Sequence, residues 1–375
     1  TATQPDSSTP HHTTTSNQAT KKMASLTTST TAKEDEQQMK QSMMNEAKAM
    51  NNMDGKDKKG DVRVSSYATA LETLVSMIPT EGDKVEKFMY RSLHLDCDDV
   101  KHPCLGKTRN DVHRAFLLWS QKPNDRAEDS FNVSKAFRRL ETFSDYQLKM
   151  YEPYFSTPVD ITSPDIVEAS QIMNIKVPEQ TYGGALAWVI DLDRTDMEAM
   201  SKLKAEGGCD LNDLMRYFWA LMLQGMFDDV SCSEGCIVLQ DMGTMGFGTM
   251  LSFQKSIKPI ENDMNAMFYG VMPFKMKSCI LTGSPWWMSA LLAFMRLFIS
   301  KKMSGRIKNL YKKDMWLIMG GQDQLPLGYI GGTKPYVERY PGYTMEKESS
   351  PADESKSDAN DGDKAEAEGE QEITF

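Results

Sequence analysis

The sequence is poor in histidine and cysteine, and this limits the chemistry that it can carry. Only five histidines occur in 375 residues, and none lies beyond His113. Acid–base catalysis by histidine is therefore excluded from the long region that follows. The six cysteines are irregularly spaced in a long chain, which is not typical of a disulfide framework and favours a reduced, cytoplasmic protein.

One short segment gathers histidine and cysteine closely enough to raise the question of zinc. His94, Cys97, His102 and Cys104 lie within eleven residues. Their spacing matches none of the usual zinc clips, and a zinc site needs four ligands that converge tetrahedrally. We therefore expect surface-loop residues here and no metal. Cys232 and Cys236 lack nearby histidines and are weaker candidates.

The common enzymatic motifs are also missing. The segment DMGTMGFGTM places Gly243, Gly246 and Gly248 after an expected strand, where a glycine-rich turn can bind phosphate. It is neither GxGxxG nor a P-loop, so a plain loop is the favoured interpretation. There is no GxSxG, HExxH or kinase signature. Paired carboxylates remain formally possible, but we expect neither an enzyme nor a cofactor.

Long uncharged apolar runs and a strong basic charge are absent as well. The longest apolar candidate runs from Trp286 to Ile299 and contains Arg296, so no membrane span is predicted. The polar first residues lack the apolar segment of a secretory signal. Of the net charge of −10, a charge of −8 lies between Glu346 and Phe375. The nearly neutral remainder argues against a nucleic-acid partner and leaves room for a small local basic patch.

Composition divides the chain into four parts. Residues 1–64 are low in complexity and are expected to be disordered. Residues 65–152 show helical periodicity, with helices predicted near 65–78, 108–120 and 131–151. Residues 153–343 are expected to form an α/β domain. Residues 344–375 form an acidic tail that is also expected to be disordered.

The α/β region alternates short apolar runs with helical stretches. Strands are predicted at 185–192, 236–241, 278–283 and 315–320, because runs that are apolar on both faces suit a parallel sheet covered on both sides. Helices are predicted at 211–228 with Asp210 as N-cap, at 257–271 and at 286–307. Strand alternating with helix implies right-handed crossovers.

The chain is rich in methionine. It has 28, many of them in the α/β region. Methionine is flexible and polarizable, so such a set suits either an adaptable apolar surface or simply a methionine-rich core. The sequence leaves both interpretations open.

The order of motifs resembles the CRAL-TRIO (Sec14-like) lipid-binding family. The resemblance spans about 150 residues and rests on GGALAWVID, EGCIVLQDMG, VMPFKMKSCILTGSPWWM, LFISKKMSGRIK and LPLGYIGG, in that order. Upstream, FNVSKAFRRLE is similar to the helical N-terminal subdomain of the family. Within the family, the motif pattern of this chain is most similar to that of the tocopherol-transfer and retinaldehyde-binding branch. The resemblance implies a largely parallel sheet that floors an apolar pocket covered by a gate helix.

The resemblance also implies site residues. Four basic residues would bind a phosphoinositide headgroup: Lys275, Lys277, Lys302 and Arg306. Seven would line the lipid pocket: Met264, Met267, Phe268, Met272, Phe274, Met276 and Cys279. Six would belong to the gate helix: Trp286, Trp287, Leu291, Phe294, Met295 and Phe298. A helix that is apolar around its circumference is in any case buried or covers something apolar.

Several departures mark a divergent member of that family. Where the phosphatidylinositol-binding branch has Pro-Glu-Arg, this chain has Pro273-Phe274-Lys275, which argues against phosphatidylinositol as the buried ligand. The gate segment Arg296-Leu297-Phe298-Ile299 lacks the usual proline, so its hinge geometry is left open. The ligand cannot be copied from any branch.

The expected function is non-enzymatic binding and intermembrane transfer of one hydrophobic lipid of acyl or isoprenoid type. Docking would be peripheral, on an anionic phosphoinositide membrane surface, by a cytoplasmic monomer that visits membranes transiently. The alternative is a lipid-gated sensor or scaffold, whose protein partners read the occupancy of the pocket and whose acidic tail regulates that interaction.

Overall fold

The computed structural model describes most of the chain between residues 60 and 335. The described residues are 60–82, 84–95, 100–121, 130–177, 185–201, 203, 209–244, 246–286, 288 and 304–335. Both expected terminal tails therefore lie outside the described residues, apart from residues 60–64. Six of the predicted site residues also lie outside them: Trp287, Leu291, Phe294, Met295, Phe298 and Lys302.

The first part of the described chain is helical, as predicted. Its helices are α2 (Tyr67–Ser76), α3 (Arg109–Ser120) and α4 (Val133–Met150), with the short turns η1 (Glu86–Met89) and η2 (Arg91–Leu93) between them. A capping box starts α3, because Thr108 and Asp111 satisfy each other's backbone N–H groups. Asn132 caps α4 by accepting a hydrogen bond from the backbone N–H of Lys135.

Apolar faces of these helices form one core with the rest of the chain. Phe116 of α3 and Phe143 of α4 are fully buried, and the ring of Phe143 stacks on that of Trp219 in a later helix. A two-stranded antiparallel ribbon of β1 (Arg63–Val64) and β2 (Phe131–Asn132) joins the start of the described chain to α4. The helical part is thus packed on the α/β part.

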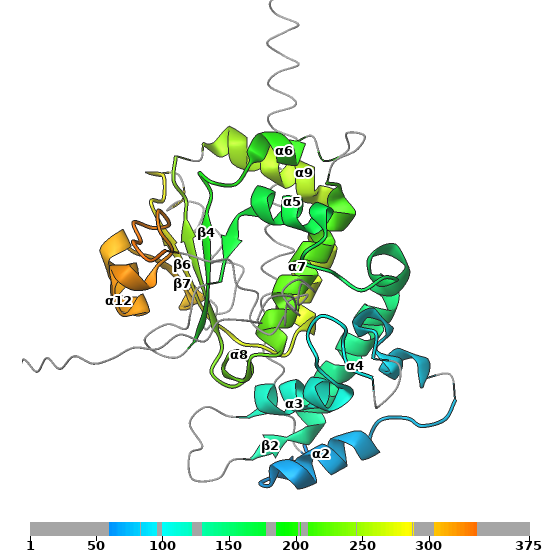
Figure 1. Ribbon diagram of the computed structural model, residues 1–375. Helices are drawn as coiled ribbons and strands as arrows, with labels where there is room; N and C mark the ends of the chain where they lie inside the picture. Colours follow the sequence, from blue (N-terminus) through cyan, green and yellow to red (C-terminus); the bar gives the residue numbers. More distant parts are fainter. Residues whose placement is uncertain are drawn as a thin grey trace, which may run out of the picture. The chain divides into compact units, whose positions relative to one another are not determined.

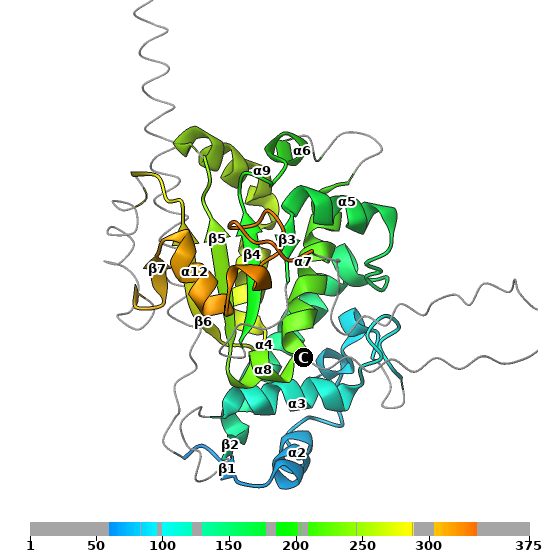
Figure 2. The same ribbon diagram turned by 60° about the vertical axis from the view of Figure 1, so that its left-hand side comes forward.

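The α/β part is built on one mixed, mostly parallel sheet. Its strands are β3 (Ile175–Lys176), β4 (Leu186–Asp191), β5 (Cys236–Asp241), β6 (Met276–Thr282) and β7 (Ile307–Asn309), and their spatial order is the order of the sequence. The pairs from β4 to β7 are parallel, whereas β3 pairs antiparallel with β4. Figure 2 shows the strands side by side. The predicted strands at 185–192, 236–241 and 278–283 are confirmed.

Helices cover the two faces of this sheet unequally. One face carries α5 (Pro164–Met173), α7 (Leu211–Met226) and α9 (Phe247–Ala266), and the other carries α12 (Lys312–Met319), as Figure 1 shows. The remaining short elements are α6 (Met197–Ser201), α8 (Asp229–Ser233), and the turns η3 (Tyr151–Phe155), η4 (Met267–Val271) and η5 (Gln322–Gln324).

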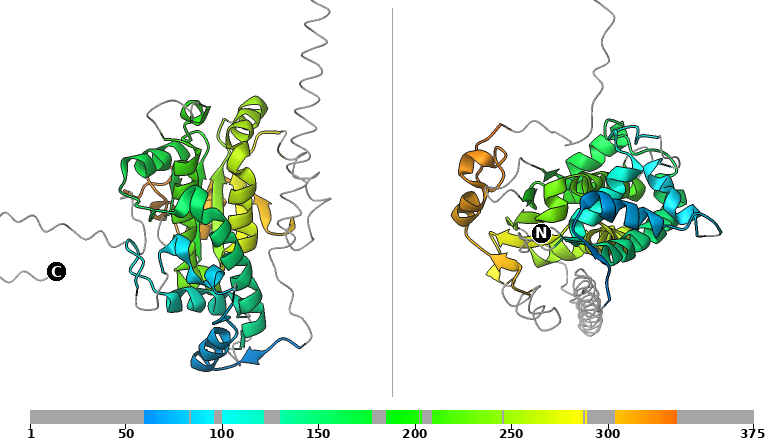
Figure 3. Two further views of the ribbon diagram at one scale, coloured as in Figure 1. Left: turned by 90° about the vertical axis from the view of Figure 1, so that its right-hand side faces the viewer. Right: turned by 90° about the horizontal axis from the view of Figure 1, so that it is seen from below.

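The helical part meets the sheet at the end where β5 and β6 begin, and Figure 3 shows its blue and cyan helices gathered at that end. Arg139 of α4 is buried and donates a hydrogen bond to the carbonyl of Met272, 3.1 Å away. Tyr146 of α4 donates to the carbonyl of Asp263 in α9 at 2.9 Å. Hydrogen bonds to backbone carbonyls therefore fix the helical part against the region that precedes β6.

One predicted strand is wrong. Residues 315–320 belong to α12 and the turn after it, not to the fourth strand that was predicted there. A short apolar run does not distinguish a strand from a helix by its periodicity. The ends decide here: Asp314 caps the helix start at Tyr311, and Gly320 takes the left-handed conformation (φ 88°) that ends a helix. Leu317 is 76 % exposed, as expected for the outer side of a surface helix.

Two helix boundaries also differ from the prediction. Helix α9 begins at Phe247, ten residues before the expected start, and Phe247, Met250 and Leu251 at its beginning already follow the helical spacing of three and four. At the other end the chain leaves the α-helix at Ala266 and continues as the wider turn η4. The helix expected at 286–307 does not reach its predicted end, because residue 307 begins strand β7.

Candidate functional site

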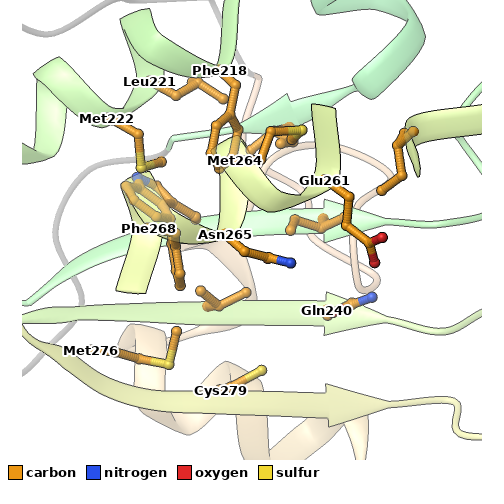
Figure 4. Close-up of a pocket in the computed structure, with 15 residues that line it drawn as sticks. Phe218, Leu221, Met222, Gln240, Glu261, Met264, Asn265, Phe268, Met276 and Cys279 are labelled. Carbon is orange, nitrogen blue, oxygen red and sulfur yellow. The ribbon is translucent and has the colours of Figure 1, made fainter. Parts of the chain in front are cut away.

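A cavity lies between the sheet and the helices α7 and α9. Its volume is about 240 Å³, slightly below the range that is usual for small-molecule pockets. Figure 4 shows the wall as sticks. The wall is made of Ile175, Trp188, Ile190, Phe218, Leu221, Met222, Val238, Gln240, Ile257, Glu261, Met264, Asn265, Phe268, Met276 and Cys279.

Strand alternation supplies the floor of the cavity. In β4 and β5 the alternate residues Trp188 and Ile190, and Val238 and Gln240, are paired in register and face the cavity. Their neighbours along each strand point to the other face of the sheet. The floor thus follows from the period of two in an extended chain.

A β-bulge places two residues of β6 on the same floor. Met276 pairs with Cys236, but Ser278 pairs with the very next residue, Ile237, so one residue of β6 is extra. Without it, Met276 and Cys279 would point to opposite faces. The extra residue, Lys277, is exposed at the start of the strand.

Helix periodicity supplies the roof. On α7, Phe218, Leu221 and Met222 lie on one stripe, and Asp210 caps the start of the helix by accepting from the backbone N–H groups of Asn212 and Asp213. On α9 the wall residues recur at spacings of three and four: Ile257, Glu261, Met264 and Asn265, and Phe268 follows in η4. Both helices therefore turn a fixed face toward the sheet.

Aromatic rings close the apolar end of the cavity. The ring of Trp188 lies 5.4 Å from that of Phe268 and 5.5 Å from that of Phe274, the latter edge to face. Helix α7 can approach these rings because residue 225 is glycine: a Cβ there would lie 3.3 Å from both Phe274 and Trp188. The ring contacts hold this end rigid.

Three wall residues are polar: Gln240, Glu261 and Asn265. Glu261 is only 4 % exposed, and its carboxylate lies 3.1 Å from the ammonium of Lys258. The carboxylate also accepts a longer hydrogen bond of 3.4 Å from the side chain of Gln254. The charge is thus compensated from its own helix.

The thiols near the cavity are unreactive. Burial raises the pKa of the Cys279 thiol to about 11 and that of the Cys236 thiol to about 12. Burial also raises the pKa of Cys232 well above its usual value. These thiols are therefore protonated at neutral pH, and a protonated thiol is a poor nucleophile.

The predicted pocket residues fall into two groups. Met264, Phe268, Met276 and Cys279 lie on the cavity wall. Met267, Met272 and Phe274 are buried but lie off the wall. The carbonyl of Met272 accepts a hydrogen bond from Arg139 of α4, so this residue lies where the α/β part meets the helical part.

Sequence reasoning missed most of the cavity wall. None of the α7 and β4 residues was predicted, nor were Val238 and Gln240. A signal is present in α7, where Phe218, Leu221 and Met222 recur at spacings of three and four as an apolar stripe. The stripe alone does not tell whether it packs against a solid core or borders a cavity.

The structure describes three of the four predicted basic residues, Lys275, Lys277 and Arg306, and their surroundings differ. The ammonium of Lys275 donates to the carbonyl of Gln121, 3.0 Å away at the end of α3, and to that of Ser233, 2.8 Å away at the end of α8. Lys275 therefore ties the helical part to the sheet. Lys277 is exposed instead, and the adjacent strand begins just after Arg306, whose carbonyl accepts from the backbone N–H of Cys279.

Of the predicted gate residues the structure describes Trp286 alone. It follows β6 directly, and its side chain is 87 % exposed. Two residues later Met288 is buried and belongs to the main core. A large exposed indole beside a buried methionine marks the point where the expected gate segment begins.

The histidine–cysteine segment shows a different use of its side chains. His102 is buried, and its Nδ1 accepts from the backbone N–H groups of Cys104 and Leu105. Burial, reinforced by the charge of His94, lowers the pKa of His102 to about 4. Cys97 lies outside the described residues, within which no group of three or more such ligands converges.

The glycine-rich segment is held by a carboxylate. Asp193 accepts hydrogen bonds from both the backbone N–H and the hydroxyl of Thr244, each at 2.8 Å. Gly243 has φ 52°, and a Cβ on it would collide with the carboxylate of Asp193. The donors that a phosphate would need are thus partly engaged with an acid, as in a structural loop.

Comparison with known proteins identifies the region around the cavity. Residues 176–329 match the CRAL/TRIO domain. This CRAL/TRIO region contains all of β4–β7 and every wall residue of the cavity except Ile175. The α/β fold predicted for it is confirmed.

Other comparisons add less. No curated protein matches the chain. Among solved structures, one titled "Crystal structure of Sfh5" is 9 % identical and has a TM-score of 0.42, with 77 % of this chain and 96 % of that chain covered. Among the helices that the structure describes, none is both long and apolar enough to cross a membrane.

Proposed function

We propose that this protein binds a single hydrophobic lipid without covalent chemistry and transfers it between membranes. The CRAL/TRIO family is known for lipid binding and transfer, and its members are generally not enzymes. The observation that carries the proposal is the cavity itself. Twelve of its 15 wall residues are apolar or a protonated cysteine, and it lies within the CRAL/TRIO region.

Energetics favour exchange over permanent capture. Burying a chain of acyl or isoprenoid type stabilises the complex by about 0.8 kcal/mol per CH₂ group. A bilayer offers the same chain a similar gain. A protein cavity therefore competes with a membrane on nearly equal terms, and loading and release are both accessible.

The first experiment is native mass spectrometry of the purified full chain, followed by organic extraction and identification of what is released. A one-to-one complex with a hydrophobic molecule is expected. Transfer is then measured between donor vesicles that carry this lipid and acceptor vesicles that lack it. A protein that stays free of ligand after exposure to total cell lipids would overturn the proposal.

Membrane docking is the second half of the proposal. We place it on Lys277 and Arg306, at the neighbouring starts of β6 and β7, with an anionic phosphoinositide surface as partner. The ammonium of Lys275 donates hydrogen bonds to two backbone carbonyls. We therefore assign Lys275 to holding the start of β6 in place and not to direct contact with the membrane. Polybasic contacts to anionic lipid are worth about 1 kcal/mol per charge near the surface.

Vesicle sedimentation tests the docking surface. Lys277→Glu is expected to lower binding to vesicles that contain a phosphoinositide about tenfold or more, because it replaces an attraction by a repulsion. Lys101→Glu, an exposed lysine in the helical part, makes the same charge change elsewhere and serves as control. Equal losses in the two variants would show a general charge effect and refute this surface.

A further inference from the structure

The cavity has one polar end. Figure 4 shows the carboxylate of Glu261 and the carboxamides of Gln240 and Asn265 on one side, with Met222, Phe268 and Met276 on the other. Chain geometry explains the division. Gln240 lies near the end of β5, and Glu261 precedes Asn265 and Phe268 along a helix that crosses the cavity. A bound ligand with one polar and one apolar end would therefore have a preferred orientation in this cavity.

Glu261 is the unusual member of this polar end. A carboxylate that is 4 % exposed among apolar side chains is costly unless its charge is compensated. The compensation comes from Lys258, one turn earlier on α9 at 3.1 Å, and from Gln254 at 3.4 Å. Both of these partners belong to α9, the helix that carries Glu261 itself.

The two carboxamides complement the carboxylate. Within the described part of the chain, the structure gives no hydrogen-bond partner for the side chain of Gln240 or Asn265, although both lie on the cavity wall. Each carboxamide offers two donor hydrogens and an acceptor oxygen, whereas an ionised carboxylate only accepts. Together they suit a group that both donates and accepts, and that bears no negative charge.

We propose that the cavity selects an uncharged lipid alcohol, with its hydroxyl at the polar end formed by Gln240, Glu261 and Asn265 and its hydrocarbon among Met222, Phe268 and Met276. This inference rests on the proposed function and names the ligand class for it. The hydroxyl donates to the carboxylate of Glu261 and accepts from a carboxamide. A fatty acid is disfavoured, because its carboxylate would be buried against another one, and such like-charge contacts cost several kcal/mol.

Decanol and decanoate test this directly, since they share a chain and differ in the head group. Each is titrated at neutral pH into delipidated full-length protein loaded with the apolar dye Nile red, and dye displacement is measured. Wild type is expected to prefer decanol by about tenfold or more. Glu261→Gln is expected to remove most of this preference by raising the affinity for decanoate.

A matched control lies on the same helix. Asp263 is also a carboxylate of α9, but it pairs with Lys149 of α4, and it is not on the cavity wall. Asp263→Asn changes the net charge as Glu261→Gln does, so it should leave the preference for decanol intact. A change of the same size in both variants would overturn the inference by showing an effect of net charge.

A second variant covers the case in which Glu261→Gln does not fold. Asn265→Leu keeps the carboxylate and removes a carboxamide, so it should weaken decanol binding without strengthening that of decanoate. Equal affinity of wild type for the two ligands overturns the choice of a lipid alcohol but leaves lipid binding standing. Failure of both ligands to bind, together with a ligand-free protein in native mass spectrometry, overturns lipid binding as well.

Discussion

The two faces of the central sheet are formed by the same strands, but one face is packed against α12 and the other borders the cavity. On one face Ala187, Val189 and Leu239 pack tightly beneath α12 and the segment that follows it. On the other face, Trp188 and Gln240 alternate with them and border the cavity under α7 and α9. Small and branched residues form a buried cluster on the first face, whereas bulky, flexible and polar residues border a cavity on the second. Alternation along a strand thus separates a buried, packed face from a face that borders a cavity.

The largest difference should appear when the same leucine is truncated on each face. Leu239→Ala, on the packed face, is expected to lower the free energy of unfolding by about 2–5 kcal/mol, because it leaves a cavity in a close-packed core. Leu221→Ala, on the cavity roof, should cost clearly less, since this side chain already borders empty space and loses fewer contacts. Denaturant unfolding of delipidated protein measures both.

Lipid affinity is the second readout of this pair. It should change in Leu221→Ala and remain that of wild type in Leu239→Ala. The comparison of faces fails if the roof variant is the more destabilised of the two. It also fails if the packed-face variant is the one that loses lipid.

The titration of His102, which lies in the helical part and on neither face of the sheet, gives a reference for the stability measurements. In the folded protein the pKa of His102 is about 4, below its usual 6.5, because the ring is buried. The folded state therefore binds fewer protons than the unfolded state between these values. The free energy of unfolding falls as the pH drops from about 6.5 to about 4, by about 3 kcal/mol in total, and His102 contributes no further change below that range.

His102→Asn removes this titration and keeps an acceptor for the backbone N–H groups of Cys104 and Leu105. Denaturant unfolding at several pH values should show a smaller loss of stability on acidification in the variant than in wild type. The same pH dependence should appear in Leu221→Ala and Leu239→Ala, because His102 belongs to the helical part. An unchanged slope in His102→Asn would mean that other groups cause the acid sensitivity.

Much of the fold could be predicted because its signals are local. The apolar runs at β4, β5 and β6 and the cap at Asp210 each identify an element from a few neighbouring residues. The run at 315–320 could not be assigned this way, because its helical state depends on Gly320 and on the surface that Leu317 faces. The short strands β3 and β7 carry too few residues for a pattern and form through pairing with longer neighbours.

The cavity and its wall were less predictable, because they depend on which elements pack together in three dimensions. A bulge decides that Met276 and Cys279 share a face, and no residue pattern in β6 announces it. The ammonium of Lys275 contacts the carbonyls of Gln121 and Ser233, which are distant in sequence, so no local pattern indicates these contacts. In the sequence, Glu261 is one of several charged residues in the second half of α9, and nothing near it indicates burial. Its burial is a property of the packed domain and not of the local sequence.

Adjacent residues of β6 allow a test of intermediate size. Ile280→Phe adds volume to the packed face and is expected to cost about 1–3 kcal/mol of stability with unchanged lipid affinity. Cys279→Phe adds a ring to the cavity, so it should reduce lipid binding strongly while changing stability by less than about 1.5 kcal/mol. Equal loss of lipid in both variants would show that this cavity does not hold the ligand.

The smallest expected effect on stability comes from Gly225→Ala in α7. Alanine favours the helix by about 1 kcal/mol relative to glycine. Its Cβ would lie 3.3 Å from the rings of Trp188 and Phe274, which is tight, and the ring of Trp188 can yield only toward the cavity that it borders. The two effects oppose each other, so the free energy of unfolding should stay within about 1 kcal/mol of wild type, while the narrowed cavity binds lipid more weakly. Gly270→Ala is the control, because a Cβ at Gly270 meets no atom within 4 Å. If both alanine variants bind lipid equally well, the ring of Trp188 does not limit the space for the ligand, and the apolar end of the cavity extends beyond it.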